Sequence, residues 1–176
     1  MKKLEYTLAN FKNVQDLIKY QDQKTAAILV IVSILISVFL EISKGLEIIE
    51  PERLLSTTLT FWNIGCFITG FVFIALAVYI FYICIFQVLK PKFIKKYDDS
   101  KNSTFYFGHI ADSKLNDFRA RISTIKEEEM LNDVTGQLFE VSNILQNKAS
   151  RCSKAMSYLF CCIVTLILYL FTTIML

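Results

Sequence analysis

The sequence predicts an all-α integral membrane protein with about three transmembrane helices and a small helical cytoplasmic domain. The first observation behind this prediction is a set of three uncharged, mostly apolar stretches: Thr25–Leu40, Leu54–Leu89 and Ala155–Leu176. A helix needs about 20 predominantly apolar residues to cross a bilayer. The second is the charge, because seventeen of the nineteen Lys and Arg residues lie before the first stretch or between the second and third. The third is the helical periodicity of the polar segments.

The boundaries of the predicted segments follow from these stretches. The first stretch is short for a membrane span, but Lys24 and Glu41 can lengthen it by snorkelling to the two interfaces. The third fits a single span directly. We therefore expect, in chain order, a cytoplasmic amphipathic helix (1–24), transmembrane helix 1 (25–42), an external loop (43–60), transmembrane helix 2 (61–88), a cytoplasmic helical domain (89–154) and transmembrane helix 3 (155–176).

The second stretch is longer than one span requires. Its 36 residues would form a helix about 54 Å long, against a hydrocarbon core of about 30 Å. Hydroxyl and amide side chains at its start, followed by Trp62, are typical of the outer interface. We expect one tilted helix over 61–88. A re-entrant hairpin at Gly65 or Gly70 is the alternative.

The distribution of basic residues predicts the orientation. Five precede Thr25 and twelve lie between Lys90 and Lys154, whereas the loop between the first two stretches has only Lys44 and Arg53. The positive-inside rule assigns the basic side to the cytoplasm. The N-terminus is therefore predicted inside and the C-terminus outside. The first apolar stretch follows a long charged segment, which argues against a cleavable signal peptide.

Composition argues against several functional classes. The net charge of +3 is too weak for a nucleic-acid-binding protein. The five cysteines lack the CxxC spacing of a metal site, and we expect them to be small core residues. No paired-carboxylate, Ser/His/Asp, Cys/His, P-loop or metal-ligand arrangement is present, so we predict no catalytic residues, no metal and no enzyme.

The polar segments predict three helices. The N-terminal one carries apolar residues at three- and four-residue steps and should continue unbroken into the first span. Asp112 or Ser113 is expected to cap the next. The third should begin at the acidic run Glu127–Glu129 and, without a proline, continue into the last span. The apolar stripe of the second helix comprises Leu115, Phe118, Ile122 and Ile125.

The third predicted helix has a narrow apolar seam of the coiled-coil type. Its members are spaced 3, 4, 3 and 4 residues apart, and such a seam needs a partner. Either the N-terminal helix covers it, or the same helix of another subunit does. The seam residues are Leu131, Val134, Leu138, Val141 and Leu145.

Three consecutive aromatic residues, Phe105, Tyr106 and Phe107, precede Gly108 and the single histidine, His109. Three successive side chains cannot all point into one small core from a single face. At least one is therefore available to stack on a neighbour or a ligand. The alternative is a loop that closes a small hydrophobic core.

Two segments resemble motifs of a known family. Tyr20–Leu29 (YQDQKTAAIL) is similar to a D-x-K-A/T-A signature at a first span, and Asn102–Ala111 (NSTFYFGHIA) is similar to N-x-x-F-F-G-x-I-A. Tyr106 stands where the second motif has a phenylalanine. The stretch Asp133–Lys148 also looks like the family's final cytoplasmic helix. In this order relative to three spans, the motifs resemble the Pycsar effector transmembrane family over most of the chain.

This resemblance implies an effector of bacterial anti-phage defence in the inner membrane. A partner pyrimidine nucleotide cyclase would make cCMP or cUMP, and the effector would respond by impairing the membrane, causing abortive infection. The domain over 89–154 would be the sensor. Its output would be a change in a homo-oligomer that forms through the seam. The alternatives are a constitutive membrane scaffold and a small channel gated by another signal. The predicted ligand residues are Lys24, Phe105, Tyr106, Phe107, Gly108, His109, Arg119 and Arg121.

Overall fold

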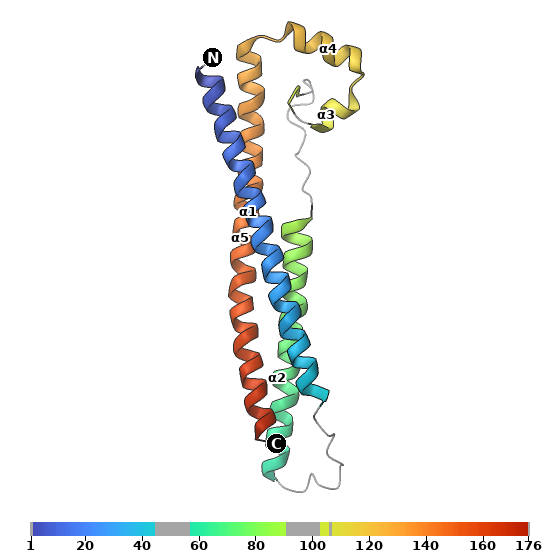
Figure 1. The fold of residues 1–176 in the computed structure, drawn as a ribbon, viewed down its shortest axis with the longest axis vertical. Helices are drawn as coiled ribbons and strands as arrows, with labels where there is room; N and C mark the ends of the chain where they lie inside the picture. Colours follow the sequence, from blue (N-terminus) through green and yellow to red (C-terminus); the bar gives the residue numbers. More distant parts are fainter. Residues whose placement is uncertain (1, 45–56, 91–102, 106, 176) are drawn as a thin grey trace. The chain divides into compact units, whose positions relative to one another are not determined.

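The described structure consists almost entirely of helices. The computed structural model describes residues 2–44, 57–90, 103–105 and 107–175, and no strand occurs among them (Figure 1). The predicted all-α membrane fold is confirmed, because three helices are long and apolar enough to cross a membrane. The elements are α1 (Lys2–Lys44), α2 (Thr57–Tyr82), the π-helix η2 (Ile83–Leu89), α3 (Phe107–Asp112), α4 (Leu115–Thr124) and α5 (Glu127–Ile174).

The chain divides into two compact units. Residues Met1–Gln21 and Pro91–Ala149 form the first, here called the polar unit. Residues Asp22–Lys90 and Ser150–Leu176 form the second, here called the membrane unit. Helices α1 and α5 therefore contribute residues to both units.

The lengths of α1 and α5 follow from what their sequences lack. No glycine or proline occurs between Lys2 and Lys44, and the next residue in the sequence is Gly45, a type of residue that often follows a helix end. Helix α5 begins at Glu127, as the acidic run predicts, and continues to Ile174. Both predicted continuations, from a polar helix into an apolar one, are confirmed.

The long second stretch has no hairpin. Helix α2 passes through Gly65 and Gly70, and the π-helical turn follows without a break, so the re-entrant alternative is wrong. The reason is packing. A Cβ atom on Gly70 would lie 3.3 Å from a ring carbon of Tyr169 and 3.6 Å from the ring of Phe39. Gly70 thus lets α1 and α5 approach α2 closely.

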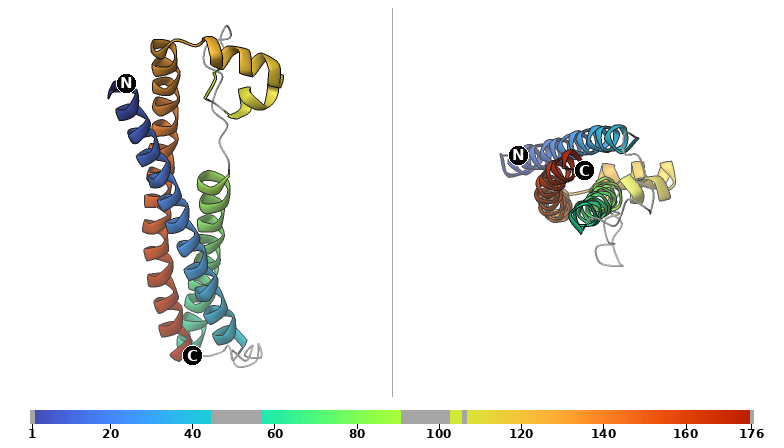
Figure 2. Two further views of the ribbon diagram at one scale, coloured as in Figure 1. Left: turned by 45° about the horizontal axis from the view of Figure 1, so that its top comes forward. Right: turned by 90° about the horizontal axis from the view of Figure 1, so that it is seen from below.

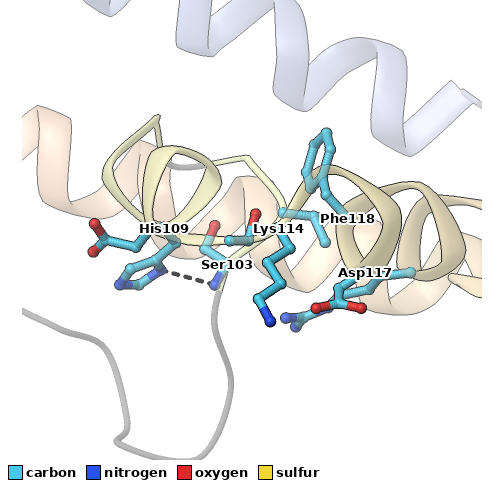
Figure 3. Close-up of a pocket in the computed structure, with 9 residues that line it drawn as sticks. Ser103, His109, Lys114, Asp117 and Phe118 are labelled. Atoms are coloured by element: carbon cyan, nitrogen blue, oxygen red, sulfur yellow. Dashed lines mark hydrogen bonds between the residues drawn. The ribbon is translucent and has the colours of Figure 1, made fainter.

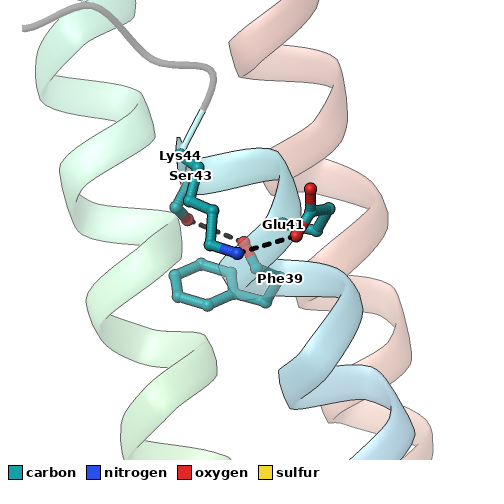
Figure 4. Close-up of polar contacts among 4 residues, drawn as sticks. All are labelled: Phe39, Glu41, Ser43 and Lys44. Carbon is teal, nitrogen blue, oxygen red and sulfur yellow. Dashed lines mark hydrogen bonds and ion pairs between the residues drawn. The ribbon is translucent and has the colours of Figure 1, made fainter.

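Apolar side chains of α1, α2 and α5 form the core of the membrane unit, where these segments lie side by side (Figure 2). Near the C-terminal end of α1, the ring of Phe39 stacks on Phe73 at 4.8 Å and tilts against Tyr169 at 4.7 Å. Ser43 and the Glu41–Lys44 ion pair lie on the same last turns of α1 (Figure 4). Cys66, Cys84, Cys152 and Cys162 are buried as expected, whereas Cys161 is exposed.

Helix α4 differs from its prediction in two ways. Its N-cap residue is Lys114, which has an extended backbone and makes no side-chain capping bond, so the predicted cap at Asp112 or Ser113 is wrong. The Ser113 hydroxyl donates instead to the carbonyl of Ile110 at the end of α3. None of the α4 residues is buried. Two members of its apolar stripe are well exposed, Leu115 at 62% and Ile122 at 49%.

Candidate ligand-binding site

The short segment Ser103–Phe105 precedes α3 and is held by hydrogen bonds from three successive backbone N–H groups. The Ser103 N–H donates to His109 Nδ1 at 2.9 Å, and the Phe105 N–H donates to Ser103 Oγ at 3.1 Å. Between them, the Thr104 N–H and hydroxyl both donate to Asp133 Oδ2, at 2.7 and 2.8 Å. Asp133 belongs to α5, so the segment is fixed to α3 and α5 together.

A cavity of about 330 Å³ lies beside this segment in the polar unit (Figure 3). Its walls come from the Ser103–Thr104 backbone segment, from α3 and the turn after it, and from one face of α4. Most of the lining side chains are polar or charged. The lining residues are Ser103, Thr104, His109, Asp112, Ser113, Lys114, Asp117, Phe118 and Arg121.

The α4 wall is explained by helical spacing. Lys114, Asp117, Phe118 and Arg121 are separated by 3, 4 and 7 residues from the first of them, and residues three and four apart are neighbours on a helix surface. Figure 3 shows the side chains of Lys114 and Asp117 on one side of α4 and the Phe118 ring on the other. The charged part of the cavity therefore lies on the Lys114–Asp117 side.

Two cations of this wall form no ion pair among the described residues, although the carboxylates of Asp112 and Asp117 line the same cavity. Among the described residues, the side chains of Lys114 and Arg121 make no hydrogen bond or ion pair. Each brings N–H donors and a positive charge to the cavity, and arginine can bind an anion through two parallel hydrogen bonds. The arrangement can therefore bind an anionic group at Lys114 and Arg121, while Asp112 and Asp117 in the same lining accept hydrogen bonds from neutral donors.

His109 contributes through its ring nitrogens. Its Nδ1 accepts the Ser103 N–H, so the proton of the neutral ring lies on Nε2, where it can be donated. This contact also explains why a histidine follows the Phe-Gly pair. The ring fixes the start of the segment that forms one cavity wall.

The structure brings together only part of the predicted ligand set. His109 and Arg121 line the cavity, but Phe105 and Arg119 are not among its lining residues. The ring of Phe105 is 39% exposed and contacts the ring of Phe11 edge-on, with centroids 5.2 Å apart. Gly108 lies in α3.

Three further predicted positions receive no placement at the site. Tyr106 lies outside the described residues, as does the side chain of Phe107. Lys24 belongs to the membrane unit. Their roles stay predictions.

Sequence reasoning missed Lys114 and Asp117 as cavity residues and assigned Phe118 to an apolar stripe. The available signal was the spacing of Lys114, Asp117 and Arg121, which places three charged residues on one helical face. That face adjoins the apolar stripe, and the stripe was the stronger pattern.

The seam of α5 is packed to different degrees along its length. Val134 is 1% exposed. The other four seam residues are half-buried: Leu131, Leu138, Val141 and Leu145. Whether a second subunit meets the seam stays a prediction.

The fold and the cavity define a class: an α-helical membrane protein with a cavity lined by polar and charged residues in its polar unit. In the described part of the chain, no cluster of His, Cys, Asp or Glu could hold a metal ion. The family model for the Pycsar effector protein domain matches residues 6–175. The chain therefore belongs to the Pycsar effector family of antiviral-defence proteins.

A curated relative agrees with this membership. The chain is similar to the Pycsar effector protein TpPycTM of Treponema porcinum, with 36% identity over 87 residues, which cover 49% of this chain and 70% of the relative. No solved structure matches the chain. Family membership implies a cyclic-nucleotide signal and a membrane context.

Proposed function

We propose that this protein is an anti-phage effector of the bacterial inner membrane that binds cCMP or cUMP and then impairs the membrane, causing abortive infection. A pyrimidine nucleotide cyclase would supply the signal. The observation that carries the proposal is the cavity between α3 and α4, where the side chains of Lys114 and Arg121 make no hydrogen bond or ion pair among the described residues.

The volume of the cavity supports a small ligand. Small-molecule pockets usually measure about 300–1,000 Å³, and this cavity of about 330 Å³ lies at the lower end of that range. The cyclic phosphate carries one negative charge. Lys114 and Arg121 would meet it, because charge-assisted hydrogen bonds to phosphate are stronger than neutral ones.

The remaining lining groups suit the sugar and the base. The carboxylates of Asp112 and Asp117 can accept hydrogen bonds from a ribose hydroxyl or a base N–H, and His109 Nε2 can donate to a base carbonyl. Stacking on an aromatic ring contributes about 1–3 kcal/mol per base in single-stranded nucleic-acid binders. We assign this contact to Phe118, an aromatic residue of the lining. Tyr106 and Phe107 stay the predicted alternatives, because the ring of Phe105 packs against Phe11.

The response would pass from the polar unit to the apolar helices. Because α1 and α5 contain both polar-unit and membrane-unit residues, a change in their packing is not confined to the sensor. A homo-oligomer formed through the α5 seam would rearrange and distort the second and third spans. Arg119 on α4 is a further candidate for ligand contact.

Titration calorimetry of the full-length protein in detergent tests the ligand. The wild type is expected to bind cCMP or cUMP and to reject cyclic dinucleotides. Lys114→Ala should weaken binding about tenfold or more, the scale of a lost hydrogen bond to a charged group. Lys126→Ala is the matched control, because it removes the same charge from an exposed residue outside the cavity. A wild type that binds neither nucleotide would overturn the proposal.

A further inference from the structure

The segment Ser103–Phe105 contacts residues of three helices at once. Ser103 is bonded to His109 of α3, Thr104 to Asp133 of α5, and the Phe105 ring lies against Phe11 of α1. Ser103 and Thr104 also line the cavity. The same three residues therefore form a cavity wall and join the two helices that run on into apolar stretches.

The contact with α5 depends on one carboxylate oxygen. Asp133 Oδ2 accepts both the backbone N–H and the hydroxyl of Thr104, at 2.7 and 2.8 Å, and both contacts are partly buried. Hydrogen bonds to an ionised acceptor are roughly twice as strong as neutral ones. Asp133 does not line the cavity itself. It holds the wall residue Thr104 in place through these two hydrogen bonds.

The contact with α1 is aromatic. The rings of Phe11 and Phe105 meet edge to face, at an interplanar angle of 81°. This is a favoured geometry for an aromatic pair. It gives the first aromatic of the segment a structural partner on α1.

We propose that Asp133 and Phe11 are transmission residues, which relay occupancy of the cavity through Thr104 and Phe105 to α5 and α1. A ligand touching Ser103 or Thr104 acts on His109 and Asp133, which accept hydrogen bonds from the Ser103 N–H and from the Thr104 N–H and hydroxyl. Helix α5 continues from Asp133 to Ile174, and α1 from Phe11 to Lys44, so each relay contact lies on a helix that includes membrane-unit residues. This inference rests on the proposed function for the identity of the ligand.

The test separates binding from response. Full-length protein is reconstituted into vesicles loaded with a dye, and cCMP or cUMP is titrated while dye release is followed; affinity is measured in parallel by calorimetry. Asp133→Ala is expected to bind within about threefold of the wild type but to need about tenfold more nucleotide for release, within the usual range of coupling between two sites. Phe11→Leu, which removes the ring but stays apolar, should show the same split.

Glu140→Ala is the matched control. Glu140 is a half-buried carboxylate seven residues further along α5 and makes no hydrogen bond or ion pair within the described residues. It should match the wild type in both measurements. If Asp133→Ala fails to fold, Thr104→Val decides, because it removes only the hydroxyl bond to Asp133 and nearly keeps the side-chain volume.

The results distinguish this inference from the proposed function. The inference is overturned if Asp133→Ala releases dye at the same nucleotide concentration as the wild type. It is also overturned if the variant needs more nucleotide only in proportion to its loss of affinity. If the wild type binds neither nucleotide, the proposed ligand is wrong. Protection of cells from phage then decides. If Asp133→Ala loses protection and Glu140→Ala keeps it, the relay is supported. If the two variants protect cells equally, the relay is overturned.

Discussion

The Tyr169 hydroxyl on α5 lies 2.8 Å from Ser43 Oγ on α1, although the two residues are 126 positions apart. The Ser43 hydroxyl has a single proton and donates it to the carbonyl of Phe39 at 2.7 Å. Tyr169 must then be the donor to Ser43. One hydrogen bond thus joins the last turn of the first apolar helix to the third.

Removing this bond should destabilise the membrane unit slightly. Interhelical hydrogen bonds in membranes are worth about 0.6 kcal/mol on average and at most about 1.7 kcal/mol. We expect Tyr169→Phe and Ser43→Ala each to lower the stability by that order, and the double variant to cost less than their sum. Unfolding in mixed micelles measures the free energy of unfolding of each variant. Tyr158→Phe, whose hydroxyl has no partner among the described residues, should have no effect.

The two glycines of α2 should respond differently to alanine. Alanine favours a helix over glycine by about 1 kcal/mol. A Cβ on Gly65 meets Thr172 at 3.5 Å, an ordinary contact, whereas on Gly70 it meets Tyr169 at 3.3 Å. Gly65→Ala should therefore be the more stable variant in a thermal scan. Gly70→Leu should cost about 1–3 kcal/mol through overpacking, and a stable Gly70→Leu protein would contradict the close approach of the helices.

Ligand binding should weaken with salt. The cations Lys114 and Arg121 are unpaired among the described residues, and partly exposed charges are screened as ionic strength rises. The dissociation constant for cCMP or cUMP is expected to increase between low and physiological salt. Lys114→Ala should reduce this dependence and Lys126→Ala should keep it. An affinity independent of salt would argue against a charged contact.

The His109–Ser103 contact should protect a backbone amide. Hydrogen exchange at Ser103 is expected to be slower in the wild type than in His109→Ala, because the ring nitrogen no longer accepts that N–H. His109→Asn supplies an oxygen acceptor and should restore part of the protection. Exchange at Thr104, bonded to Asp133, provides the internal reference.

Trp62 should report whether the start of α2 lies at a membrane interface. It is the only tryptophan in the chain, and its ring contacts Phe61 at 5.6 Å and Phe171 at 6.0 Å. Tyr79, which contacts Tyr158 at 5.0 Å, is 17 residues further along α2, or about 26 Å along a helix. Two aromatic groups at that separation suit the two interfaces. Lipids brominated near the headgroup should quench Trp62 more than lipids brominated at the chain ends.

Sequence patterns predicted the helices better than their contacts. The absence of proline and the long apolar stretches were sufficient for α1 and α5. The hydrogen bonds between Thr104 and Asp133 join residues 29 positions apart. Such a contact produces no repeating pattern of residues, so the sequence could not indicate it. At least one of Phe105, Tyr106 and Phe107 was expected to stack on a neighbour or a ligand, and the structure places the ring of Phe105 against Phe11, a contact that the sequence did not indicate. The choice between helix and hairpin at Gly70 depended on side chains of two other helices.

The π-helical turn has a consequence for chain length. Its last bond runs from the Lys90 N–H to the Ile85 carbonyl, five residues back, and Ile83 and Val88, also five apart, are both buried. In an α-helix, residues four apart share a face instead. We therefore expect deletion of Ile85 or Phe86 to restore α-helical winding while Ile83 and Val88 stay on the buried side. The π-helical turn is in this sense one extra residue of chain, added after α2 without moving these two side chains out of the core.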